Sequence, residues 1–175
     1  MRKEIVLENF EFTEKDPSFT PRTPYSYMLP EELKDIKYYP YRLDEHTPFA
    51  ATFRINGERL VLRGVVPKGF CYNLADIPFL CQLISYDKHS PFVKDASFIH
   101  DYLIDRKKEL YNFWKLKEKG ITPGDFRLMT SLIFCHQLKK NAVPYGKAQL
   151  MAFFVNLWQH VLPSWYALDK TETTL

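Results

Sequence analysis

The stretch DASFIHDYLI, residues 95–104, places His100 beside Asp101 inside an otherwise apolar helical pattern. Burying an imidazole or a carboxylate costs several kcal/mol unless the group is hydrogen-bonded, paired or bound to a metal. The sequence therefore predicts that each of these two side chains has a dedicated partner.

Asp125, near the start of the next predicted helix, would complete a catalytic site. A carboxylate bonded to one imidazole nitrogen orients the ring and leaves the other nitrogen to activate a water, which is general-base catalysis. In this interpretation His100 is the base and Asp101 is an oxygen ligand for Ca²⁺. In the structural interpretation protein groups satisfy the pair, with Asn73 and Asp76 of the preceding loop as the expected partners.

The spacing of the two helices bears on this choice. Consecutive helices joined by a short loop pack antiparallel, which puts His100 and Asp125 at opposite ends unless the first helix breaks early. The charged run Asp105-Arg106-Lys107-Lys108 is the predicted break.

The remaining histidines and cysteines form no recognisable site. The histidines have no mutual metal spacing, and no Gly-rich phosphate loop or G-x-S-x-G sequence occurs. The cysteines are odd in number and lack C-x-x-C spacing, which favours free thiols over disulfides or a zinc site. These residues are His46, His89, His136, His160, Cys71, Cys81 and Cys135.

Composition indicates one folded domain. The chain has 175 residues, of which 46% are hydrophobic and 16% aromatic, enough to bury a core. The net charge of +3 comes from 24 basic and 21 acidic residues without a basic stripe, so we expect no nucleic-acid partner. No signal peptide or transmembrane segment is predicted, and we expect synthesis in a reducing cytoplasm.

The predicted elements are a hairpin followed by three helices. Asn56-Gly57 lies between two alternating runs in residues 49–66 and supplies the positive φ angles of a type I′ turn. The first helix is predicted to begin at Ala96, with Asp95 as its N-cap, and to end before Gly120 at the C′ position. The second begins after Thr122, and the third spans about residues 145–162.

Residues 10–41 contain five of the twelve prolines, mixed with Tyr and Phe at no strand or helix period. This pattern predicts an extended arm that either wraps its own core or docks on a neighbouring subunit, with Pro21, Pro24, Tyr25 and Tyr27 as candidate contacts. We predict an α+β fold, in which the arm (1–45) and a small antiparallel sheet or hairpin pack on a three-helix cluster. The domain spans 46–163, and 164–175 form a tail.

Four ordered motifs resemble a known family. They are VVPKGFCYNLADIP at 65–78, ASFIHDYLI at 96–104, ITPGDFRLM at 121–129 and NAVPYGKAQLMAFFVNLW at 141–158. Together they resemble the phage-associated domain-of-unknown-function family 1353, whose loop motif corresponds here to Gly69, Phe70, Asn73, Asp76 and Pro78. The resemblance implies a protein of tailed phages or prophages.

The motifs are also similar to the helix pair of phospholipases A2. There an H-D-x-x-Y helix supplies the base and a calcium ligand, and an Asp on the partner helix orients the base. This similarity implies the same roles for His100, Asp101 and Asp125. The chain departs from the family pattern at Asn73, where the family has Asp, and at Ile104, where it has Tyr, and an Ile cannot donate a hydrogen bond to an orienting carboxylate.

Three functions follow as hypotheses. The first is a non-enzymatic virion or tail component, made in the host bacterial cytoplasm, that contacts other viral structural proteins or further copies of itself through the arm and needs no cofactor. The second is a calcium-dependent esterase, phospholipase-like enzyme or other envelope-directed hydrolase. The third is an intracellular protein that interacts with the host.

Overall fold

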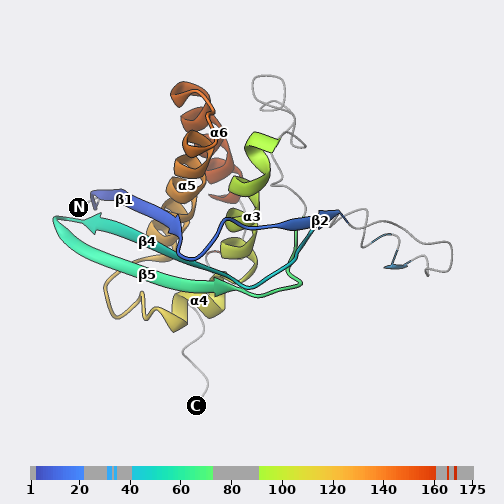
Figure 1. The fold of residues 1–175 in the computed structure, drawn as a ribbon. Coiled ribbons are helices and arrows are strands. Elements are labelled where there is room, and N and C mark those ends of the chain that lie inside the picture. The colour runs from blue at the N-terminus through green and yellow to red at the C-terminus, as the bar shows by residue number, and fades with distance from the viewer. Residues whose placement is uncertain are drawn as a thin grey trace, which may run out of the picture.

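The computed structural model of the chain describes residues 3–21, 31–32, 34, 41–72, 91–160, 165 and 168. Among the elements whose bounds the structure describes, two small antiparallel sheets precede four helices, so the fold is α+β as predicted. Figure 1 shows α3, α5 and α6 running alongside one another next to the longer sheet. In chain order the helices are α3 (Pro91–Asp105), α4 (Lys107–Phe113), α5 (Pro123–Lys140) and α6 (Tyr145–His160).

The larger sheet has the strand order β1-β4-β5, with β1 at Ile5–Phe12, β4 at Thr47–Ile55 and β5 at Glu58–Val66. Asn56 and Gly57 join β4 to β5 with φ angles of 50° and 90°, which confirms the predicted hairpin turn. Its predicted alternation is also confirmed, because Phe53 and Leu62 are buried whereas Arg54, Arg59 and Arg63 are exposed.

The N-terminal segment is more regular than the sequence pattern indicates. β1 pairs with β4 from Ile5 to Phe12, with a register irregularity between Leu7 and Asn9. β2 (Phe19–Pro21) pairs with β3 (Tyr41–Leu43), which also pairs with β6 (Cys71–Tyr72) in the second sheet. The expectation that residues 10–41 follow no strand period is therefore wrong for the residues in β1 and β2.

The helices follow the prediction with one correction. α3 begins at Pro91, so Asp95 lies inside the helix and is not its N-cap. A proline suits the first turn of a helix because its missing N–H would have no partner there. The predicted break is confirmed, since α3 ends at Asp105 and α4 begins at Lys107. Gly120 has the predicted left-handed φ, 68°, but it ends a series of turns that follows α4.

Helix α5 begins as predicted. Thr122 accepts a hydrogen bond from the backbone N–H of Asp125 at 3.1 Å, and the Asp125 carboxylate accepts one from the backbone N–H of Thr122 at 2.9 Å. This capping box satisfies two backbone donors that the first turn leaves without helical partners.

Helix side chains cover the outer edge of β5. The Trp114 indole donates to the Arg63 carbonyl at 2.8 Å, and the Tyr102 hydroxyl donates to the Val65 carbonyl at 3.1 Å. Side chains thus take the place of a neighbouring strand at this end of the edge, which limits pairing with another chain. Nearby, Gly64 leaves room for the buried Phe49 ring, because a Cβ at Gly64 would lie 2.7 Å from it.

The buried apolar residues form two clusters. The larger joins the inner face of the β1-β4-β5 sheet to α3, α4 and the first half of α5. The smaller joins the start of α3 to the end of α5 and to α6. His100 lies on α3, among the helices. None of the helices in the described residues is long and apolar enough to cross a membrane.

Candidate functional site

His100 lies in the interface of three helices. Its side chain is 4% exposed, and its ring centroid is 5.2 Å from that of Phe134 on α5. Its Nε2 atom lies 2.7 Å from Nε2 of Gln159 on α6. This short contact is a hydrogen bond between the imidazole and the side-chain amide, and the tautomer of the imidazole sets which group donates.

The other ring nitrogen faces the neighbouring carboxylate. His100 Nδ1 is 3.7 Å from Asp101 Oδ1, which is beyond hydrogen-bond length, and among the described residues Nδ1 has no hydrogen-bond partner. One nitrogen is thus engaged by an amide and the other is enclosed beside Asp101. Neither nitrogen faces an open cleft formed by described residues.

The surroundings of His100 are polar as well as buried. Four buried side chains on α3, α5 and α6 each carry one polar atom that has no hydrogen-bond partner among the described residues. They are Ser97 Oγ, His100 Nδ1, Gln137 Nε2 and Gln159 Oε1. Buried polar atoms of this kind are ordinarily satisfied by ordered water. The centre of this helix interface is therefore a polar patch within an otherwise apolar packing.

Asp125 is held at the other end of α5. Its carboxylate takes part in the capping box with Thr122 and lies 3.0 Å from the Lys3 ammonium. Burial by itself would raise the pKa of Asp125, but hydrogen bonds from Thr122 and Lys3 to the ionised carboxylate outweigh burial and lower it. His100 packs against Phe134, nine residues further along α5, a rise of about 13 Å. The structure therefore does not bring His100 and Asp125 together.

The residues described around Asp101 do not suit calcium. Calcium takes six to eight oxygen ligands, several of them from carboxylates. Among the described residues no group of three His, Cys, Asp or Glu side chains could hold a metal ion. Asp101 Oδ1 lies 3.7 Å from Nδ1 of His100, and an imidazole contributes no oxygen ligand.

The other predicted site residues are only partly described. Gly69 has a φ of 85° and donates to the Leu43 carbonyl at 2.9 Å, and Phe70 packs edge-on to Tyr102 at 5.4 Å. Pro21 ends β2 opposite Tyr41. The rest lie outside the described residues: Asn73, Asp76, Pro78, Pro24, Tyr25 and Tyr27. Cys71 and Cys135 are free thiols, Cys135 buried and Cys71 partly exposed, and Cys81 lies outside the described residues.

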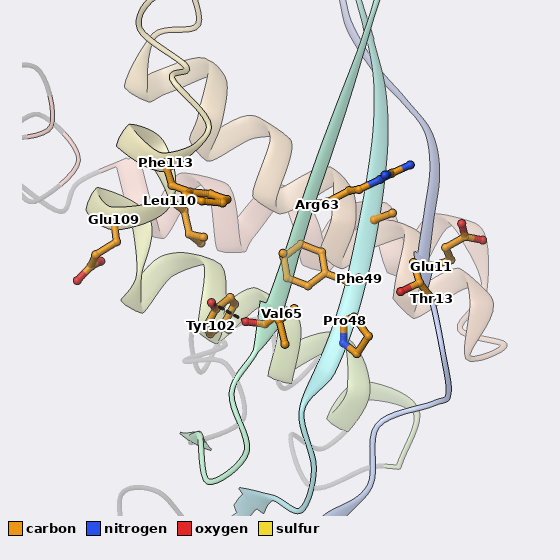
Figure 2. Close-up of a pocket in the computed structure, with 12 residues that line it drawn as sticks. Glu11, Thr13, Pro48, Phe49, Arg63, Val65, Tyr102, Glu109, Leu110 and Phe113 are labelled. Carbon is orange, nitrogen blue, oxygen red and sulfur yellow. Dashed lines mark hydrogen bonds between the residues drawn. The ribbon is translucent and has the colours of Figure 1, made fainter.

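A surface hollow of about 870 Å³ lies where β5 meets α4, away from His100. Figure 2 shows Phe49 and Val65 at its centre, with Glu109 and Phe113 on one side and Glu11 on the other. Burial raises the pKa of Tyr102, whose hydroxyl is already bonded to the Val65 carbonyl. The two carboxylates come from opposite sides of the hollow, so this lining does not form a general acid–base pair.

The residues that contact His100 were not predicted from the sequence. Gln159 and Phe134 come from two other helices, and neither is marked by a motif. The one signal for Gln159 is its position on the apolar face of α6, where it is 4% exposed. A polar side chain among the inward positions of a helix indicates a buried hydrogen bond.

These features define a small α+β protein whose sequence motif lies in a helix interface and not in a described cleft. The family model described as "Protein of unknown function (DUF1353)" matches residues 50–155, which is more than half of the chain, and the protein belongs to this family. Comparison with curated proteins and with solved structures finds no match.

Proposed function

We propose that this protein is a non-enzymatic component of a bacteriophage virion or tail, and that His100 acts as a clamp between helices. The observation that carries the proposal is the burial of His100 against Phe134 with its Nε2 bonded to Gln159. A general base must reach a substrate or a water and needs a free nitrogen. Here one nitrogen is occupied by an amide and the other is enclosed, which favours the structural role over the hydrolase.

The position of Asp125 supports the same choice. The catalytic interpretation needs this carboxylate on the imidazole, whereas it serves the N-terminus of α5 and pairs with Lys3. The role of a motif residue follows from the geometry of its site and not from the resemblance, and this geometry serves helix packing. The phage origin rests on the family resemblance, and the proposed partners are other virion proteins.

The test is the protein content of purified virus particles. Particles from the source phage are banded by density, treated with protease to remove adhering proteins, and analysed by quantitative mass spectrometry. The proposal predicts a fixed number of copies per particle, in proportion to the major tail or capsid protein. A protein that is abundant in the infected cell and missing from particles would contradict the virion assignment.

A separate assay addresses the enzymatic alternative. Purified protein is incubated with phospholipid vesicles or a chromogenic ester in calcium, beside its His100→Ala variant. The proposal predicts no turnover above buffer for either protein. Calcium-dependent turnover that His100→Ala abolishes while the fold is retained would overturn the structural role.

A further inference from the structure

Helix α6 exposes large apolar side chains on the face that points away from the protein. The exposed fractions are 37% for Leu150, 59% for Phe153, 47% for Leu157 and 50% for Trp158. Phe154 is partly buried and its ring lies edge-on to Phe153, with centroids 5.6 Å apart. We call these five residues the α6 outer stripe. They follow helical spacing and form one continuous strip over about two and a half turns.

The same helix is apolar on its inner face, where it packs on α3 and α5. Ala148, Met151, Ala152 and Val155 are buried there. A surface helix normally sets its apolar face against the core and its polar face against water, whereas a helix that is apolar on opposite sides is covered on both. Within the described residues, nothing covers the outer side of α6. The pattern therefore points to an interface.

The charge pattern favours a second copy of this chain as the occupant. From Gln149 to Gln159 the helix carries no charged residue, with Lys147 before this segment and His160 after it. Interface centres are depleted in charge and enriched in aromatic residues. A stripe without charges needs no partner of opposite sign, and it is complementary to an identical stripe across a two-fold axis.

The exposed area is sufficient for a small dimer. A buried aromatic side chain contributes about 150–250 Å², so the half-exposed Phe153 and Trp158 offer roughly 100 Å² each. With the two leucines, each copy offers roughly 400 Å². Two copies then bury about 800 Å², the size of a weak, concentration-dependent association.

We propose that two copies of the chain associate through antiparallel packing of their α6 outer stripes. Phe153 and Leu157 lie near the two-fold axis, and Leu150 of each copy contacts Trp158 of the other. The antiparallel arrangement brings Lys147 of each copy to the C-terminal end of the opposing helix, where the helix dipole favours a cation. This inference concerns assembly and holds independently of whether the protein is part of a virion.

The test measures the mass of the full chain in solution by light scattering and sedimentation. We expect a concentration-dependent approach to twice the chain mass of 20.8 kDa over about 1–100 µM. Phe153→Glu places a carboxylate near the axis and should weaken association at least thirtyfold, about the size of an interface hot-spot effect. A wild-type chain that stays monomeric over this range, or a dimer that Phe153→Glu leaves unchanged, would overturn the proposal.

Two controls separate self-association from loss of folding. Phe113→Glu changes an aromatic residue that is 73% exposed on α4 and should leave the dimer intact. Phe153→Glu and Phe153→Lys should each be monomeric with wild-type circular dichroism and melting temperature. Mixing these two variants should restore a dimer, because the two-fold axis sets the opposite charges against each other. A mixture that remains monomeric would contradict the two-fold packing.

Discussion

Gln159 and His100 meet across 59 positions of sequence, with their Nε2 atoms 2.7 Å apart in a buried interface. Their contact joins α6 to α3, and the Phe134 ring on α5 packs against the same imidazole. A single histidine thus contacts side chains from both of the other long helices. This arrangement explains a histidine in an apolar helical stretch without invoking catalysis.

Removing the imidazole should destabilise the protein. His100→Ala leaves a cavity against Phe134 and leaves the Gln159 amide without its hydrogen-bond partner, and the two losses together are expected to cost about 2–4 kcal/mol in free energy of unfolding. Urea denaturation followed by circular dichroism measures this change. The comparison variant is His46→Ala, because His46 is exposed and its Nδ1 accepts one hydrogen bond, from the backbone N–H of Lys68 at 3.3 Å, so its loss should cost no more than about 1 kcal/mol. Equal effects of the two substitutions would contradict a clamp.

The decrease in the free energy of unfolding at acid pH should depend on Asp125. Its pKa is lower in the folded protein than its ordinary value of 3.8, because hydrogen bonds from Thr122 and Lys3 outweigh burial. Between the two pKa values the unfolded chain binds more protons, so the contribution of Asp125 is complete above about pH 4 and is lost as the pH falls through the folded pKa. Urea denaturation from pH 2 to 7 should show a weaker acid dependence in Asp125→Asn than in wild type.

The control for this titration is Asp16→Asn, since the Asp16 side chain is 86% exposed. That variant should keep the wild-type acid dependence. The prediction fails if Asp125→Asn and wild type lose stability in parallel below pH 4. At neutral pH the free energy of unfolding of Asp125→Asn should be roughly 1 kcal/mol lower than that of wild type, because one half of the capping box is weakened.

Gly64 should tolerate no side chain. A Cβ there would lie 2.7 and 2.9 Å from atoms of the Phe49 ring, which is buried among Phe10, Tyr102 and Trp114. Gly64→Ala should therefore cost about 1–3 kcal/mol by overpacking. Gly146→Ala is the matched control on α6, where the new Cβ meets nothing within 4 Å and should stabilise the helix by up to about 1 kcal/mol. Melting temperatures of the two variants should move in opposite directions, and a shift in the same direction would contradict the close approach of Phe49.

Local sequence signals predicted the local structure. The Asn56-Gly57 turn and the Thr122 capping box were predictable because each depends on a few adjacent residues with defined backbone preferences. The strand at Ile5–Phe12 was missed because the irregularity between Leu7 and Asn9 shifts its alternation, so that Ile5 and Leu7 are out of phase with Phe10 and Phe12. The start of α3 was misplaced because Asp95 resembles an N-cap, while Pro91 lies at the first helical position.

The surroundings of the candidate site could be predicted only in part. The sequence indicated that His100 needs a partner, and it left open whether an early break in the first helix would bring His100 and Asp125 together. The sequence did not indicate Gln159 as the partner. The contact between α6 and α3 depends on how three helices pack, and no short segment of sequence encodes that packing. A similarity between motifs shows only that certain residue types occur at a certain spacing. Which side chain from a distant helix contacts them depends on the tertiary structure.

The most direct test of the clamp is a double-mutant cycle between His100 and Gln159. Free energies of unfolding are measured for wild type, His100→Ala, Gln159→Ala and the double variant. A buried hydrogen bond between the two side chains predicts a coupling energy of about 1 kcal/mol or more, because either single change already removes the contact. Additive effects, with a coupling energy below about 0.3 kcal/mol, would contradict the role of His100 as a clamp between α3 and α6.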